Sequence, residues 1–210
     1  MLKKISLKIL VIFLFSSCIF GQSAQDVVKK IQNKFESIYN LTADFTQASV
    51  IPGSKSSAKN SGKIYFQKEN KYRIEFKSME IISDGVTIWN YNKKAKKVVI
   101  NNADDESNSF SLKNLIIDYP NQSTASLLGN EKINGQEFTV INLKPKKEES
   151  NFEAIKIWSS ADGMVRKAEI VDNNRASLIF ELSSIDTDRK ISSDKFVFKK
   201  PAGTEVIDLR

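Results

Sequence analysis

The sequence contains no histidine, and its single cysteine, Cys18, lies in the apolar N-terminal segment. These two absences exclude a Ser-His-Asp or Cys-His nucleophile, a histidine-containing zinc site and a thiolate cluster. Carboxylates, lysine and tyrosine remain, but no acidic pair stands in a recognisable motif, and neither GxGxxG nor a phosphate-binding loop occurs. The composition therefore argues against an enzyme, and no cofactor or metal site is expected.

Long apolar runs are missing from the chain after its N-terminal segment. Residues 1–8 are short and basic, and residues 9–20 form an apolar run that is too short to span a bilayer. Residues 1–21 are therefore predicted to be a signal peptide that is cleaved after its last residue, with cleavage after Ala24 as the less favourable alternative. Residues 22–210 are predicted to be an exported single domain of ordinary size.

Cys18 leaves a second possibility open for the N-terminus. It follows Phe15-Ser16-Ser17, which loosely resembles the lipobox of bacterial lipoproteins, in which the cysteine becomes the lipidated first residue. Phe15 stands where that motif usually carries leucine. An ordinary cysteine in a discarded leader is the favoured interpretation, and it leaves the mature chain without a thiol.

Basic residues outnumber acidic ones, but the two signs are interspersed. The net charge of +7 includes the three leader lysines, so +4 remains after their removal. The alternation of lysines with acids is typical of a solvated surface, with weak attraction to anionic membranes as the alternative. Nucleic acid is not an expected partner, because the chain is exported and its aromatic residues lie on the uncharged sides of their strands.

Short alternating segments dominate the mature sequence. In KYRIEFK, residues 71–77, charged residues alternate with Tyr72, Ile74 and Phe76, as in an antiparallel strand with one buried face. Asp84-Gly85 between two apolar runs is a strong hairpin signal. Further strands are predicted around Ile64 and Phe66 and at 41–51, 80–83, 86–91, 97–101, 131–134, 137–143, 153–159, 164–171, 176–185 and 195–199. About ten or eleven short strands from residue 62 onwards, after the strand at 41–51, predict one large curled antiparallel sheet or a barrel.

Three segments favour helix. Residues 23–40 carry apolar residues at helical spacing, and Ser23 with Asp26 forms an approximate capping box. A further helical turn is expected at 122–128, with Gly129 as its stop. The remaining helix is predicted from the spacing of Phe110, Leu112, Leu115, Ile116 and Tyr119. Such helices bury their apolar stripes against the apolar face of the sheet.

Large rings on the apolar faces of the strands belong either to a solid core or to the lining of a cavity. These rings are Phe66, Tyr72, Phe76, Trp89 and Tyr91. Periodicity does not separate the two arrangements. Aromatic residues are core residues far more often than ligand contacts, so the residues alone favour the core.

Four stretches resemble, in order, the motifs of one known family. SDGVTIWNYN, 83–92, is similar to Ser-Asp-Gly-Lys-Thr-Leu-Trp-x-Tyr-Asn, and LTADFTQ, 41–47, resembles Ala-x-Phe-Thr-Gln. GKIYFQKENKYRIEF, 62–76, resembles a strand–turn–strand with Arg-Pro-Asn in the turn, and FVFKKPAGTEV, 196–206, resembles Phe-x-Phe-x-x-Pro-x-Gly-x-x-Val. The family is that of the periplasmic lipoprotein carriers (LolA). Residues 101–130 match it poorly.

The resemblance implies a fold and a function. The implied fold is α+β and mainly β, an unclosed antiparallel β-barrel with amphipathic helices capping its concave apolar face. The cavity under the helices would hold the acyl chains of lipoproteins. The implied partners are acylated lipoproteins, an inner-membrane lipoprotein-releasing transporter, and an outer-membrane acceptor or membrane surface, with a monomeric carrier in the periplasm. The implied acyl-binding residues are Ile64, Phe66, Tyr72, Ile74, Phe76, Trp89 and Tyr91, and the implied lid residues are Phe110, Leu112, Leu115 and Ile116.

The lid latch is where the sequence departs from the family. The family's lid-locking arginine falls on Lys68, and a flexible ammonium lacks the five-donor fork of a guanidinium. We therefore expect a weakly held lid. Arg73 is the nearest alternative arginine, but alternation places it on the charged face of its strand.

Two other functions remain open at this point. The first is a lipid-anchored outer-membrane acceptor of the same fold, with Cys18 lipidated. The second is a periplasmic binding or sensor domain that holds no lipid. The mass of the mature N-terminus separates the first from the carrier, and retained acyl cargo separates the second.

Overall fold

The computed structural model describes residues 23–54, 58–103, 113–147, 149–150 and 152–210. These residues form one twelve-stranded sheet and four helical elements. One half of the sheet contains β1 (Asn40–Val50), β2 (Ala58–Gln67), β3 (Lys71–Phe76), β4 (Met79–Asp84), β5 (Thr87–Asn92), β6 (Lys97–Asn102) and β12 (Glu205–Asp208). The other half contains β7 (Ser123–Ile133), β8 (Gln136–Pro145), β9 (Phe152–Ser159), β10 (Val165–Asp172) and β11 (Ser177–Asp186).

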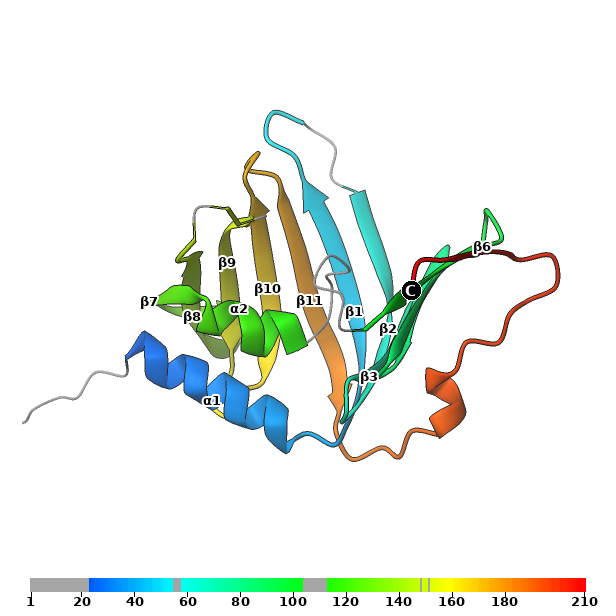
Figure 1. The fold of residues 1–210 in the computed structure, drawn as a ribbon. Helices are drawn as coiled ribbons and strands as arrows, with labels where there is room; N and C mark the ends of the chain where they lie inside the picture. The colour runs from blue at the N-terminus through cyan, green and yellow to red at the C-terminus, as the bar shows by residue number, and fades with distance from the viewer. Residues whose placement is uncertain (1–22, 55–57, 104–112, 148, 151) are drawn as a thin grey trace, which may run out of the picture.

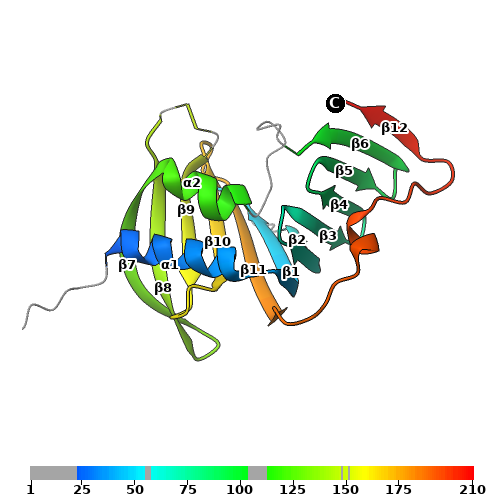
Figure 2. The same ribbon diagram turned by 60° about the horizontal axis from the view of Figure 1, so that its bottom comes forward.

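The sheet is open. Its strand order is β12-β6-β5-β4-β3-β2-β1-β11-β10-β9-β8-β7, so β12 and β7 are the two edges and do not pair with each other. All neighbours are antiparallel except β12 and β6, which are parallel. The halves curl towards each other (Figures 1 and 2). The prediction of a mainly β, unclosed antiparallel sheet with helices on its concave face is confirmed.

The hairpin turns follow from the residues that the sequence places between the strands. At the β7–β8 turn, Asn134 and Gly135 have φ angles of 50° and 81°, the left-handed pair that a two-residue hairpin favours. At the β4–β5 turn, the Oδ1 atom of Asp84 accepts hydrogen bonds from the backbone N–H groups of Val86 and Thr87 at 2.9 and 2.8 Å. These local interactions fix the register of each hairpin.

Helix α1 (Ala24–Ser37) begins at the predicted capping box. The Ser23 Oγ accepts a hydrogen bond from the backbone N–H of Asp26 at 3.1 Å, and the Asp26 carboxylate accepts one from the backbone N–H of Ser23 at 3.2 Å. The helix crosses the concave face of the β7–β11 half, where it contacts β7 and β8 (Figure 1). Its buried stripe is Val27, Val28 and Ile31, each 2% exposed. The amphipathic pattern therefore packs where it was expected to pack.

The concave face carries two apolar clusters, one in each half of the sheet. The first joins the stripe of α1 to Ile141, Leu143, Ile155 and Ile157 of β8 and β9. The second is built from β1, β2 and β3, with Phe45, Ile64, Phe66, Tyr72 and Ile74. Helical segments cover the first cluster more completely than the second (Figure 2).

The region after β6 differs from two of the predictions. The described part of the predicted lid helix is not a regular α-helix. It is a π-helical turn, η1 (Asn114–Asp118), followed by the short α2 (Tyr119–Asn121). Residues 122–128 are not helical, because β7 begins at Ser123 and pairs along its length with β8. Gly129, with φ of 111°, lies at an irregularity in that pairing and does not end a helix. The long-range ladder with β8 outweighs the local signal that favoured a helical turn.

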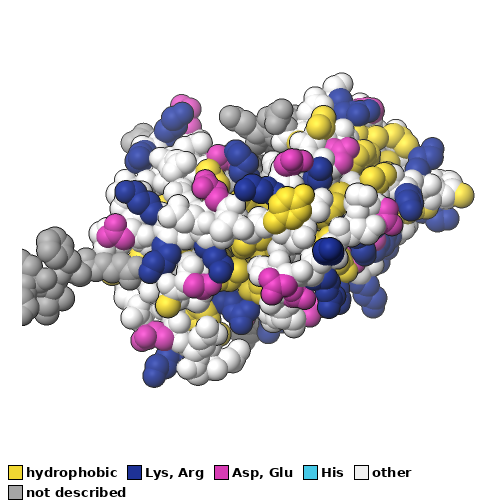
Figure 3. All heavy atoms as spheres, turned by 90° about the horizontal axis from the view of Figure 1, so that it is seen from below, with side chains coloured by type: hydrophobic (Ala, Val, Ile, Leu, Met, Phe, Trp, Pro, Cys, Tyr) yellow, Lys and Arg dark blue, Asp and Glu magenta, His cyan; other side chains and the backbone are white. Residues whose placement is uncertain are grey.

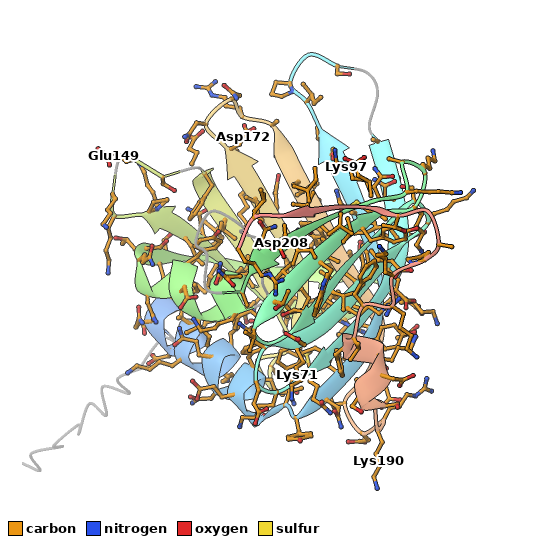
Figure 4. All side chains as sticks on the ribbon, turned by 45° about the vertical axis from the view of Figure 1, so that its right-hand side comes forward. Lys71, Lys97, Glu149, Asp172, Lys190 and Asp208 are labelled. Carbon is orange, nitrogen blue, oxygen red and sulfur yellow. The ribbon has the colours of Figure 1, made fainter. Side chains whose placement is uncertain are left out.

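The C-terminal segment also differs from prediction. Residues 195–199 are not a strand: Ser193–Phe196 form a 3₁₀ turn, η2, and the last strand is β12. Phe196, 1% exposed, is buried where η2 contacts β3 and β4. Figure 4 shows the segment from Lys190 to Asp208 running along this half of the molecule, with β12 beside β6. The alternation in Phe196-Val197-Phe198 arises because the two phenylalanines pack against the sheet, although the segment is not a strand of it.

The charged face of β3 is covered by this segment. The Nη1 atom of Arg73 donates to the backbone carbonyl of Lys195 at 3.2 Å, and its Nε atom lies 2.9 Å from a Glu75 oxygen. Arg73 also forms an ion pair with Glu80. The Glu80 carboxylate forms a second ion pair with Lys93, whose Nζ atom lies 2.7 Å from Oε1. Arg73 therefore holds the C-terminal segment on the convex side and is not a latch on the concave side.

Candidate ligand-binding cavity

A cavity of about 500 Å³ opens on the concave face between the two apolar clusters. Its volume is in the range typical of small-molecule and lipid sites. The lining is mainly apolar and comes from β1 to β4, η1, β10 and β11. Phe45 and Phe76 form one wall, where their rings meet edge to face over Gly62 with centroids 5.0 Å apart and an interplanar angle of 83°, while β10 and β11 supply lining residues from the other half. The space is therefore bounded by strands from both halves of the sheet.

Five of the seven predicted acyl-binding residues lie on the concave face. Ile64, Ile74 and Phe76 line the cavity. Phe66 and Tyr72 lie deeper in the same cluster, 4% and 2% exposed, and do not line it. Burial raises the pKa of Tyr72 to about 12, so its hydroxyl stays neutral.

Trp89 and Tyr91 lie on the opposite face, so their predicted place in the cavity is wrong. In the β4–β5 register, Trp89 pairs with Ile82 and Tyr91 with Glu80. Their rings pack against Phe198 of the C-terminal segment, at centroid distances of 6.4 and 5.4 Å. Both faces of β5 carry apolar residues, so alternation alone does not say which face points inward; the hairpin register decides it.

The predicted lid residues divide into two groups. Leu115 and Ile116 belong to η1, line the cavity, and are 6% and 8% exposed. Phe110 and Leu112 lie outside the described residues. η1 therefore covers one side of the cavity with two apolar side chains.

Several lining residues were missed by the reasoning from sequence. They are Phe45 on β1 and Leu178, Phe180 and Leu182 on β11. The sequence did carry a signal for them, because apolar and polar residues alternate in 41–47 and apolar residues recur in 177–182, as in strands with a buried face. What the sequence lacks is the pairing of β1 with β11, which joins strands from the two ends of the chain.

Polar contacts attach helix α1 to the rest of the molecule along its C-terminal half. Lys34 pairs with Asp162 of the β9–β10 turn at 2.6 Å. Lys68 donates from Nζ to the backbone carbonyl of Glu36, in the last turn of α1, at 3.2 Å. Gln32 donates to the Asn121 side chain of α2 at 3.1 Å. Lys68 thus contacts the last turn of α1, a helix that was not among the predicted lid residues.

The Lys34–Asp162 ion pair predicts that the attachment of α1 to the β9–β10 turn weakens at low pH. The hydrogen bond from Lys34, followed by that from Ser160, lowers the pKa of Asp162 to about 2. A lowered pKa in the folded state adds stability that is complete above the unfolded pKa of about 4 and is lost as the pH falls through about 2. The pair is largely exposed, so we expect at most about 1 kcal/mol from it.

Asp162→Asn should remove this contribution. Denaturant unfolding between about pH 2 and about pH 6 should show a smaller acid loss in Asp162→Asn than in the unsubstituted protein. Asp208→Asn is the control, because its pKa is also about 2 but its partner Arg210 lies at the C-terminus, away from α1. At neutral pH, amide exchange in α1 should be faster in Asp162→Asn but not in Asp208→Asn. This result would show that the Asp162 ion pair stabilises the position of α1. Equal exchange in both variants would contradict it.

Comparison with known proteins decides the family. The family model "Outer membrane lipoprotein carrier protein LolA" matches residues 36–199, most of the chain. The chain belongs to the LolA family.

Curated relatives with the name outer-membrane lipoprotein carrier protein are similar over nearly the whole chain. That of Haemophilus influenzae is 27% identical over 194 residues, which cover 88% of each protein. That of Legionella pneumophila is 26% identical over 202 residues, 95% of this chain and 96% of the relative. An uncharacterized conserved protein from Thermus thermophilus has the same fold, with a TM-score of 0.60, 12% identity, and coverage of 89% of this chain and 99% of that one.

The LolA match covers the strands that line the cavity and Lys68. Most of α1 and the whole of β12 lie outside it. No helix among the described residues combines the length and hydropathy needed to cross a membrane.

Proposed function

We propose that the protein is a periplasmic carrier that shields lipoprotein acyl chains in its cavity and carries them from the inner to the outer membrane. The observation that carries this proposal is a mainly apolar, partly open cavity of about 500 Å³ in a member of the LolA family. Residues 1–21 would be its signal peptide, and residues 22–210 its single carrier domain. No catalytic role is proposed.

Acyl chains need such shielding. Burial of each methylene is worth about 0.8 kcal/mol, so a triacylated protein does not cross an aqueous space unaided. Ile64, Ile74 and Phe76 would contact the chains from the sheet, and Leu115 and Ile116 from η1. The covering elements must move for loading and release, which calls for attachments that are individually weak. The exposed Lys68 and Asp162 contacts of α1 have this character.

The surface supports a diffusing carrier. Seen from below, basic and acidic side chains are interspersed over the visible face (Figure 3). Such a surface stays solvated and gives at most weak attraction to anionic membranes. The proposed partners are acylated lipoproteins, the inner-membrane transporter that releases them, and an outer-membrane acceptor or membrane surface. We propose that the carrier acts as a monomer.

Native mass spectrometry of gently purified protein tests the proposal. A carrier should retain acyl cargo or detergent and should begin at a free or pyroglutamyl Gln22. A lipidated Cys18 at the N-terminus would instead indicate an anchored acceptor. Protein that never binds acyl ligands, even when these are added, would indicate a binding domain that holds no lipid.

Lys68 gives a second test of the proposed mechanism. Its bond to the Glu36 carbonyl is exposed and is worth about 0–1 kcal/mol. We therefore expect Lys68→Ala to fold normally and to change cargo transfer only modestly. Lys68→Arg should tighten the closed state through its additional donors and slow transfer or leave it unchanged. The measurement is transfer from loaded carrier to acceptor membranes. If Lys68→Ala stopped transfer while Lys68→Arg matched the original, Lys68 would be a full substitute for the family's arginine.

A further inference from the structure

Every charged residue among the described residues that line the cavity is a cation. The lining includes Lys59, Lys77, Arg166 and Lys167, and no described aspartate or glutamate. Lys167 directs its ammonium elsewhere, because its Nζ atom lies 4.3 Å from the centroid of the Trp158 ring, which belongs to a separate cluster. The other three cations stand beside a mainly apolar lining. A site of this kind attracts a ligand that combines an apolar chain with negative charge.

Arg166 is the cation that the fold places most specifically. Val165 pairs with Ser159 and Lys167 pairs with Trp158, while Arg166 falls at the irregularity between them and pairs with neither. An extra residue in a strand, as in a β-bulge, changes the direction in which a side chain points. Such bulges are common beside functional sites. Val165 packs against the concave cluster, so the irregularity keeps β10 in contact with the cavity at this point.

The guanidinium of Arg166 also has no partner among the residues that the structure describes. The residue is half-buried, yet no described residue forms a hydrogen bond or an ion pair with its side chain. A guanidinium carries five N–H donors, and those of Arg166 are open to solvent, so they are available to an incoming ligand. By contrast, Arg73, on the convex face, is paired with two glutamates. An anionic group of the ligand could pair with Arg166 in place of solvent.

We propose that Arg166 binds the anionic group of an amphiphilic ligand whose acyl chain occupies the cavity. This inference rests on the proposed function, since it specifies the head of the ligand whose chains the cavity holds. The anion is a carboxylate or a phosphate, which a guanidinium binds through two parallel hydrogen bonds. It comes either from the headgroup of a lipid or from acidic residues that follow an acylated cysteine. Lys59 and Lys77 are exposed and add a weaker, salt-sensitive attraction.

Displacement of a neutral fluorescent apolar probe tests this inference with two matched pairs of ligands. The first pair is palmitate and hexadecanol, which separate the headgroup charge from the chain. The second pair is two acylated-cysteine peptides of equal length, with two aspartates or two asparagines after the cysteine. The variants are Arg166→Gln, Arg166→Lys and, as control, Arg189→Gln. Arg189 is exposed, pairs with Asp186, and does not line the cavity.

The original protein and Arg189→Gln should bind the anionic member of at least one pair about tenfold more tightly, which corresponds to about 1.4 kcal/mol. Arg166→Gln should remove this preference and leave the affinity for the neutral member unchanged, whereas Arg166→Lys should keep part of it. A preference confined to palmitate identifies a lipid headgroup as the source, and one confined to the peptides identifies the flanking residues.

Equal affinity for both members of each pair in the original protein, or a preference that survives in Arg166→Gln, would overturn the inference while the proposed function stands. Failure of all four ligands to displace the probe would overturn the proposed function itself. Retention of the original circular dichroism spectrum by Arg166→Gln shows that a loss of preference is not a loss of fold.

Discussion

Phe76→Glu should lose acyl binding by about 100-fold or more and remain folded. Phe76 lines the cavity and is only partly buried, so a carboxylate in its place stays hydrated while the cavity is empty. When an acyl chain enters, that carboxylate must give up water to a hydrocarbon chain that offers it no hydrogen-bond partner. Probe displacement by a neutral acyl ligand measures the loss, and circular dichroism reports the fold.

Phe76→Ala should cost about 1–2 kcal/mol, less than the about 3–5 kcal/mol typical of a packed phenylalanine, because one side of the ring already faces open space. Phe138 is the matched control. It is 2% exposed and packs against Val140 and Trp158 in a cluster away from the cavity. Phe138→Ala should show the full cost, and Phe138→Glu should unfold the chain. If Phe76→Glu unfolds as well, Phe76 belongs to an ordinary core and the acyl-binding role is wrong.

Gly163→Ala should displace α1 from the sheet. Gly163 has φ of 89°, and a Cβ atom there would lie 2.5 Å from the backbone carbonyl oxygen of Lys30. The new Cβ atom would press on the backbone of α1 and not on the end of a flexible side chain. The clash is therefore relieved only if α1 shifts. We expect amide exchange in α1 to accelerate by about tenfold or more, since the helix is held mainly by its apolar stripe and a few exposed polar contacts.

Gly135→Ala separates the clash from the backbone strain. Gly135 has φ of 81°, but a Cβ atom there meets nothing within 4 Å. Both variants place alanine in a left-handed conformation, which costs about 1–2 kcal/mol. Gly163→Ala should cost about 1–3 kcal/mol more, and it alone should loosen α1. Equal exchange of α1 in the two variants would show that the helix does not depend on this close approach.

The sequence determined the elements that local chemistry specifies. The Ser23–Asp26 capping box starts α1, Asn134-Gly135 closes a hairpin, and the alternation of 71–77 gives β3 with Ile74 and Phe76 on its buried face. These signals are readable because each lies within one element and repeats with that element's own period. Together they predict a large antiparallel sheet with amphipathic helices, and the ordered motifs point to the LolA family.

The tertiary structure decided what depends on residues far apart in the chain. The pairing of β1 with β11 brings Phe45 and Phe180 to one cavity, and the β4–β5 register turns Trp89 and Tyr91 away from it. Lys68 meets the end of α1 because the β2–β3 turn lies beside it. Periodicity assigns two faces to a strand but not the side on which each face lies, because strand order and register are set by packing over the whole sheet.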